Sequence, residues 1–217
     1  MFHPGKDPGL HLTSAQLKVE ALFWLRFRRQ YRIVCTEAST IGNCDVLAIG
    51  PETSVEVEVK TSKADLRRDF ANKDGKHAYY LTAAGGWAPS YFYFLVPAHL
   101  SDYAAELVVE KNHKYGVITC SATMSEPTGE NLAVTRRATK LHDRPPSAKM
   151  VNSAVARMSS ELAGLYKANL VVSGTVLAAV TSIRDNYLIA SSRIAGPLEG
   201  EEVDAIDPEW PMNLLEK

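Results

Sequence analysis

Residues 55–60 read Val-Glu-Val-Glu-Val-Lys, an unbroken alternation of apolar and charged side chains. Because successive side chains of a β-strand point to opposite faces, this alternation predicts a strand with one valine face and one charged face. The valines suit a hydrophobic core, whereas Glu56, Glu58 and Lys60 project together from the other face. The fold must therefore provide a sheet for this strand and a core to cover its valines.

The segment before this strand predicts a hairpin. Residues 45–49 predict a strand that begins with Asp45 and continues with four apolar residues. Residues 50–53, which follow it, are typical of a turn. If the two strands pair through this turn, Asp45 lies near the charged face of the next strand. The sequence therefore predicts that acids and a lysine meet on neighbouring strands.

Other local patterns predict the remaining elements. Thr13 and Gln16 resemble a capping box and predict a helix over residues 14–31, and residues 31–36 predict a first strand. Further elements are expected in the order helix, helix, strand, helix, strand, edge strand and helix, over residues 63–73, 75–84, 91–96, 101–109, 115–120, 132–136 and 147–166. This order predicts an α/β sandwich in which helices flank a mixed central sheet.

Length and composition limit the class of protein. The 217 residues suit one domain with an appendage, and 46% apolar with 23% charged residues excludes a collagen-like or disordered chain. Three cysteines without a CxxC pair argue against a disulfide scaffold and a structural zinc site. We expect an N-terminal arm, a core, a helical or mixed extension of the same domain and an acidic tail, over residues 1–13, 14–140, 147–198 and 199–217.

Charge is distributed unevenly, although the net charge is only −1. Residues 199–217 hold seven acidic side chains and one lysine, which leaves 23 basic and 18 acidic side chains elsewhere. A mildly basic body is compatible with a polyanionic partner. The start of the chain lacks the apolar region of a secretory signal, and residues 168–183 are too short and too polar to span a bilayer. We therefore expect a cytoplasmic protein with no membrane partner.

The expected cluster of Asp45, Glu58 and Lys60 has the parts for metal-assisted phosphodiester hydrolysis. Mg²⁺ binds through one or two carboxylates, polarises a phosphodiester oxygen and lowers the pKa of a bound water. A lysine beside that water or phosphate stabilises the charge that develops on phosphorus. The alternative is structural, because many amphipathic edge strands alternate in the same way and their lysines block aggregation.

At these residues the chain resembles the PD-(D/E)XK nuclease superfamily. The similarity rests on the stretches CDVLAIG, VEVEVKTSKADLRRDF, YFYFLVP and YGVI, and it covers about residues 14–140. It is greatest to the MmcB-like branch of DNA-repair nucleases. The resemblance implies a restriction-endonuclease-like fold and a Mg²⁺-dependent DNase, with Mn²⁺ as a substitute metal. Cys44 stands where the name of the superfamily places a proline.

The resemblance also implies roles for individual residues. Asp45, Glu58 and the backbone carbonyl of Val59 would bind the metal. Lys60 would orient or activate the attacking water. Glu20, on the first predicted helix, would support the site, since many members of the superfamily carry a glutamate there. Its apolar neighbours predict that Glu20 faces inward, and the alternative is a partly buried, paired acid.

Basic residues directly after the strand are the expected DNA contacts. They are Lys63, Arg67, Arg68, Lys73 and Lys76. Phosphate contacts of this kind position DNA but carry no sequence information. The alternative is a solvated helix that pairs its charges internally, since Asp65 and Asp69 lie among these cations.

The sequence thus predicts a metal-dependent DNA nuclease, with DNA repair or restriction as its setting. A second hypothesis is a non-catalytic DNA-binding or scaffold module that keeps the fold. A metal-dependent rise in melting temperature would favour the enzyme, whereas salt-sensitive DNA binding without metal would favour the module. The form of DNA and the oligomeric state, a homodimer included, stay open.

Overall fold

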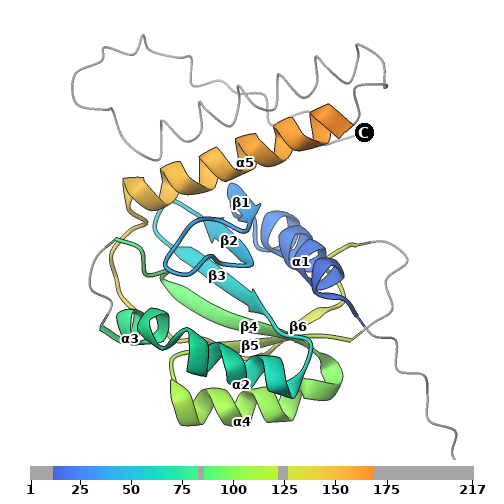
Figure 1. Ribbon diagram of the computed structural model, residues 1–217, viewed down its shortest axis with the longest axis vertical. Coiled ribbons are helices and arrows are strands. Elements are labelled where there is room, and N and C mark those ends of the chain that lie inside the picture. Colours follow the sequence, from blue (N-terminus) through green and yellow to red (C-terminus); the bar gives the residue numbers. More distant parts are fainter. Residues whose placement is uncertain (1–11, 83–85, 122–126, 169–217) are drawn as a thin grey trace, which may run out of the picture.

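Figure 1 shows the computed structural model of the chain, which describes residues 12–82, 86–121 and 127–168. Helices lie on both sides of one central sheet (Figure 1). Along the chain the elements are α1 (Ser14–Phe23), the π-helical segment η1 (Trp24–Arg28), β1 (Ile33–Thr36), β2 (Val46–Ile49), β3 (Ser54–Val59), α2 (Lys63–Asn72), α3 (Asp74–Thr82), β4 (Tyr91–Pro97), the 3₁₀ turn η2 (Ala98–Leu100), α4 (Ser101–Lys111), β5 (Gly116–Cys120), β6 (Leu132–Arg136) and α5 (Ala148–Ala168).

The sheet has six strands in the described part of the chain, and they lie side by side in sequence order. β1, β2 and β3 form an antiparallel meander, β4 and β5 run parallel to β3, and β6 is antiparallel to β5. The predicted α/β architecture with a mixed sheet is therefore confirmed. The observed order of elements agrees with the predicted one, and element ends differ by a few residues because hydrogen bonding decides where each one stops.

The two faces of β3 differ as the alternation predicts. Val55, Val57 and Val59 pack in a core cluster with α1. On the other face, the two glutamates contact a lysine at the end of α2 and a lysine of α3. β3 lies between β2 and β4, so it is a central strand. The alternative of an exposed edge strand with a protective lysine is therefore excluded.

At β4, the face of the sheet that carries α2 and α3 is covered by aromatic side chains. Phe92 and Phe94 of β4 are fully buried with Tyr80 of α3 and Tyr115 before β5. The ring centroids of Phe92 and Tyr115 lie 4.4 Å apart in a tilted arrangement, which is a favourable geometry for aromatic pairs. Because side chains alternate along β4, its tyrosines are directed to the α1 face.

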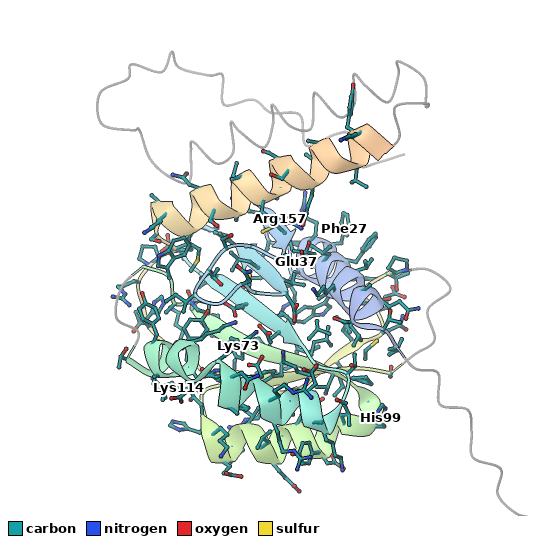
Figure 2. All side chains as sticks on the ribbon, in the orientation of Figure 1. Phe27, Glu37, Lys73, His99, Lys114 and Arg157 are labelled. Atoms are coloured by element: carbon teal, nitrogen blue, oxygen red, sulfur yellow. The ribbon has the colours of Figure 1, made fainter. Side chains whose placement is uncertain are left out.

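α5 covers the outer strands β1 and β2 (Figure 1). Its apolar side chains, Met150 and Ala154 among them, pack on the outer strands. Arg157 donates from Nε to the carbonyl oxygen of Thr36 at 3.0 Å and from Nη2 to Glu37 at 3.3 Å (Figure 2). The predicted helix over residues 147–166 therefore belongs to the same packed unit as the core.

The first helix differs from its predicted range. The capping box is confirmed, because Thr13 Oγ1 accepts from the Gln16 N–H at 3.3 Å and the Thr13 N–H donates to Gln16 Oε1 at 2.9 Å. The helix then widens into η1 and ends at Arg28. Gln30 adopts a left-handed φ of 59°, a conformation that ends helices and turns the chain toward β1.

Several predicted segments lie outside the described residues. They are residues 1–11 of the arm, residues 169–198 of the extension and the acidic tail over 199–217. In the ranges that the structure describes, no helix combines the length and the apolar character needed to cross a membrane.

Candidate functional site

The charged face of β3 is buried beneath α2 and α3. Glu56, Glu58 and Lys60 have relative exposures of 0, 2 and 6%. An unpaired charge in a low-dielectric interior is strongly unfavourable, so side chains this deep require partners. The two helices that follow β3 supply them.

Glu58 is held by three ammonium groups. Its Oε1 contacts Lys60 Nζ at 2.9 Å and also Lys73 Nζ, and its Oε2 contacts Lys76 Nζ at 3.0 Å. Lys60 follows β3 directly, and Lys76 lies in α3. Lys73 is the C-cap residue of α2 (Figure 2). The structure therefore brings the predicted acid and lysine together, and it adds two of the predicted phosphate contacts to them.

Asp69 joins the same group of charges, although the sequence analysis gave it no place in the site. Its Oδ2 contacts Lys60 Nζ at 2.6 Å and Lys73 Nζ at 3.2 Å. Its Oδ1 lies 2.9 Å from Nε2 of His77, and Nδ1 of that ring lies 3.0 Å from the Tyr115 hydroxyl. Asp69 therefore links the lysine of β3 to a buried histidine and tyrosine.

The spacing of residues in α2 holds a signal for Asp69. Leu66, Asp69 and Lys73 lie three and four residues apart, so they share one face of the helix. Leu66 is fully buried, which identifies this face as the inner one. An acid on the inner face of a helix requires polar or charged partners, and Lys60 and His77 are the buried side chains that Asp69 contacts.

Glu56 lies deepest in the group. Its Oε1 is 2.6 Å from Lys76 Nζ, and its Oε2 accepts a hydrogen bond from the Tyr80 hydroxyl at 2.6 Å. We call the six charged residues the β3–α2 ion cluster: Glu56, Glu58, Lys60, Asp69, Lys73 and Lys76. Three carboxylates and three ammonium groups balance one another, which is why the cluster is tolerated in the interior.

Burial and ion pairing shift the pKa values of the cluster in opposite directions. Burial alone would lower the pKa of Lys60, but the carboxylates of Glu58 and Asp69 outweigh it and raise that pKa above its usual value. Burial would raise the pKa of Asp69, but the hydrogen bond with His77 and the charge of Lys60 hold it well below its usual range. At Glu56 burial dominates and the pKa is raised. Lys60 and Asp69 therefore stay charged at neutral pH.

Asp45 lies just before β2, beside the end of β3. Its Oδ2 accepts a hydrogen bond from the Val59 N–H at 2.8 Å, and its Oδ1 forms an ion pair with Lys18 Nζ at 2.9 Å. The counter-ion of Asp45 thus comes from α1, whereas the counter-ions of Glu58 come from the end of its own strand and from α2 and α3. The predicted proximity of Asp45 to the β3 segment is present through Val59, but the two carboxylates bind different lysines.

Three groups at this end of the sheet carry oxygen atoms of the type that binds divalent cations. They are the carboxylates of Asp45 and Glu58 and the carbonyl of Val59, and Mg²⁺ prefers such oxygens. Both carboxylates already contact ammonium groups, so a metal fits only when an ammonium leaves. Lys73 is suited to leave, because its side chain is 27% exposed, against 2% for Lys76. Among the described residues, no group of three or more His, Cys, Asp or Glu side chains is placed to hold a metal ion.

Glu20 is fully buried, as its apolar neighbours predict, but its partners lie in the loop before β6. Its Oε2 accepts from the Gly129 N–H at 2.7 Å. Its Oε1 accepts from the Asn131 side chain at 3.2 Å and from the Thr128 N–H at 3.4 Å. These contacts are those of a paired, buried acid, so in this structure Glu20 holds a loop and is not joined to the ion cluster.

The five predicted phosphate contacts divide into two groups. Lys63, Arg67 and Arg68 are exposed on α2. Lys73 and Lys76 belong to the ion cluster, and Lys76 is only 3% exposed. The expectation for Lys76 is therefore corrected, because an ammonium buried between two carboxylates does not reach a phosphate. The reason is that α3 packs its inner face on β3.

No protein-family model matches the chain, and no curated protein matches it. Among solved structures it is similar to SPO1766, a protein of unknown function from Silicibacter pomeroyi. The sequence identity is 17% and the TM-score is 0.48, over 73% of this chain and 92% of that chain.

Proposed function

We propose that the chain is a metal-dependent nuclease that hydrolyses phosphodiester bonds of DNA, on a restriction-endonuclease-like fold. The order of elements supports this fold. A helix, an antiparallel three-stranded unit, helices and a parallel strand follow one another, as in the core that the resemblance implies. The proposal depends most on one observation, the hydrogen bond between Asp45 and Val59.

That hydrogen bond sets Asp45, the residue before β2, against the middle residue of the Glu58–Lys60 segment. Asp45, Glu58 and the carbonyl of Val59 would bind the metal once Lys73 has moved from Glu58. When bound, Mg²⁺ polarises a phosphodiester oxygen and lowers the pKa of a water ligand. Asp45 precedes β2, and Glu58 and Val59 end β3, so these donors lie at one end of the sheet, where a phosphate could approach them.

Lys60 acts in this proposal as a fixed positive charge. The neighbouring carboxylates of Glu58 and Asp69 outweigh burial and raise the pKa of Lys60, which favours its charged form. Its role is to stabilise negative charge that develops on the phosphate, which is commonly a large part of catalysis. Asp69, at 2.6 Å, is the positioning residue that orients it.

Exposed cations on α2 support DNA as the substrate. Lys63, Arg67 and Arg68 follow Lys60 closely in the chain and are open to solvent. Such side chains neutralise phosphates and make binding salt-dependent, whatever the sequence of the DNA. DNA would therefore approach the ion cluster over the outer surface of α2.

Cleavage of plasmid DNA and of single- and double-stranded oligonucleotides, with Mg²⁺ or Mn²⁺, tests the proposal. Asp45→Asn and Lys60→Met should each abolish cleavage, because one removes a charged ligand and the other removes the fixed cation. Glu110→Gln, at an exposed acid on α4, is the matched control and should cleave like the unmodified chain. Full activity in both folded site variants would refute the assignment.

A second candidate is a non-catalytic DNA-binding module, which the three ammonium groups around Glu58 favour. For such a module, DNA binding is salt-sensitive and the metal leaves the melting temperature unchanged. For the nuclease, the metal raises the melting temperature, and Asp45→Asn removes that rise. One thermal titration therefore separates the two functions.

A further inference from the structure

A pocket of about 580 Å³ lies on the α1 face of the sheet, away from the ion cluster. Its walls come from η1 and the residues after it, from the starts of β3 and β4, and from β6 with the residues that follow. Glu58 and Lys60 lie at the other end of β3, and their contacts are on the opposite face. The volume is within the range of about 300–1,000 Å³ that is usual for ligand sites.

Three tyrosines line this pocket: Tyr31, Tyr91 and Tyr93. Tyr91 and Tyr93 alternate along β4 with buried phenylalanines, so both lie on the pocket side of the strand. Each of the three tyrosines keeps part of its surface accessible. The sheet therefore offers an aromatic surface at this point.

Tyr93 is held in place within the free protein. A Cβ atom at Gly116 would lie 2.3 Å from the Tyr93 ring, so the absence of a side chain there leaves room for the ring on β5. The Tyr93 hydroxyl accepts a hydrogen bond from the Ala138 N–H at 3.3 Å. A surface that is ordered in advance loses little conformational freedom when a ligand binds.

Two arginines add positive charge to the pocket: Arg29 and Arg137, both exposed. The guanidinium of Arg29 stacks on Trp24, with 5.1 Å between its Cζ and the ring centroid. None of the described residues that line the pocket is acidic. Aromatic surface and positive charge therefore occur together.

The helical segment that supplies Trp24 has unusual geometry. In η1 the Arg29 N–H donates to the Trp24 carbonyl at 2.9 Å, which is the five-residue step of a π-helix. Such turns are rare and occur frequently at functional sites. Here the wide turn brings Trp24, Leu25 and Arg29 to the same pocket.

We propose that this pocket binds a nucleotide, with its base against the tyrosines and its phosphate at Arg29 and Arg137. Aromatic side chains stack on nucleobases of any sequence, and arginine pairs with phosphate through two parallel hydrogen bonds. A base inside a duplex is already stacked, so the ligand is a free nucleotide or an unpaired unit of a single strand. The site stands apart from the ion cluster and does not depend on the proposed nuclease activity.

The proposal is tested by measuring nucleotide binding in the presence of EDTA, which removes divalent metal and so prevents metal-dependent cleavage of the probe. The probes are thymidine monophosphate by calorimetry and a labelled oligothymidylate by fluorescence anisotropy, with a duplex of equal length as the comparison. We expect the single strand to bind more tightly than the duplex. Binding of the monophosphate as well identifies a free nucleotide as a sufficient ligand, whereas binding of the oligonucleotide alone identifies a strand.

Substitutions then locate the binding. The double variant Arg29→Gln/Arg137→Gln and the variant Tyr91→Ala should each weaken binding by about tenfold or more. Tyr91→Phe keeps the ring and should keep the affinity, and Arg144→Gln is the control at an exposed arginine outside the pocket. The proposal is overturned if neither probe binds, or if the pocket variants bind as tightly as Arg144→Gln.

Discussion

The carboxylate of Asp45 accepts a 2.8 Å hydrogen bond from the backbone N–H of Val59 and so ties the start of β2 to the end of β3. Asp45→Ala should lower the free energy of unfolding by about 1–3 kcal/mol, because a backbone donor loses a charged acceptor. It should also abolish any Mg²⁺-induced rise in melting temperature. Urea denaturation and thermal melts with and without Mg²⁺ measure the two effects. Asp45→Asn keeps a hydrogen-bond acceptor, so it should recover part of the lost stability but not the response to Mg²⁺. If Mg²⁺ raised the melting temperature of both variants as much as that of the unmodified chain, Asp45 would not be a metal ligand.

Lys73 is the partly exposed ammonium group on Glu58, and a metal would have to replace it. In Lys73→Met the carboxylate has one cation fewer, so we expect Mn²⁺ to bind more tightly than in the unmodified chain. Electron paramagnetic resonance of free Mn²⁺ gives the affinity directly and does not depend on cleavage. Lys63→Met, which removes an exposed cation of α2, is the control and should leave the affinity unchanged. Weaker binding in Lys73→Met would show that Lys73 does not compete with the metal.

Lys76 compensates Glu56 and Glu58 in the interior. Lys76→Met should destabilise the fold by about 3–5 kcal/mol, because it leaves buried carboxylates short of a counter-ion. An exposed change such as Lys63→Met should stay within about 0.5 kcal/mol in the same urea titration. The double variant Glu56→Gln/Lys76→Met should recover part of the loss, and a failure to recover would point to lost packing instead of lost charge balance.

Asp69 should make the free energy of unfolding depend on pH. Its pKa in the folded chain lies below the unfolded value of about 3.9. Its contribution is therefore complete above that unfolded value and is lost as the pH falls toward the folded value. The difference in unfolding free energy between the unmodified chain and Asp69→Asn should be large at neutral pH and should shrink below about pH 4. Asp102→Asn, at an exposed acid of α4, should show a difference that stays small throughout, and a constant difference for Asp69→Asn would disprove the linkage.

Gly116 makes room for the ring of Tyr93. Gly116→Ala should destabilise the chain by about 1–3 kcal/mol through overpacking, and it should weaken nucleotide binding because the ring must move. A Cβ atom added at Gly75 in α3 would meet nothing within 4 Å, so Gly75→Ala is the matched control. It should be neutral or stabilising by up to about 1 kcal/mol, since alanine favours a helix over glycine. Equal melting temperatures for the two variants would contradict the proposed steric role.

The local features of this chain could be predicted from its sequence because they depend on neighbours along the chain. The alternation of residues 55–60 determined which side chains of β3 share a face. Thr13 marked the start of α1, since its side chain accepts a hydrogen bond from the backbone N–H three residues ahead. Ser62 makes the same contact at the start of α2. The burial of Glu20 likewise followed from its apolar neighbours in the helix.

The partners of the charged residues depended on how the helices dock. Helical periodicity shows that Asp69 and Lys73 share a face, but it does not show whether that face meets water or β3. Lys76 was expected to contact phosphate because the sequence does not show which face of α3 is buried. In the structure it lies between the carboxylates of Glu56 and Glu58. Glu20 was expected near the metal donors, and its partner loop lies more than 100 positions away in the sequence.

The pocket is the clearest case of a feature that only the tertiary structure decided. Trp24, Tyr91 and Arg137 lie in three distant parts of the chain, and they meet because η1, β4 and the segment after β6 converge on one face of the sheet. The sequence by itself determined the elements and their apolar faces, which arise from periodicity and capping between near neighbours. Tertiary packing decided which charges are compensated and which aromatic rings meet, because those contacts join residues that no local pattern relates.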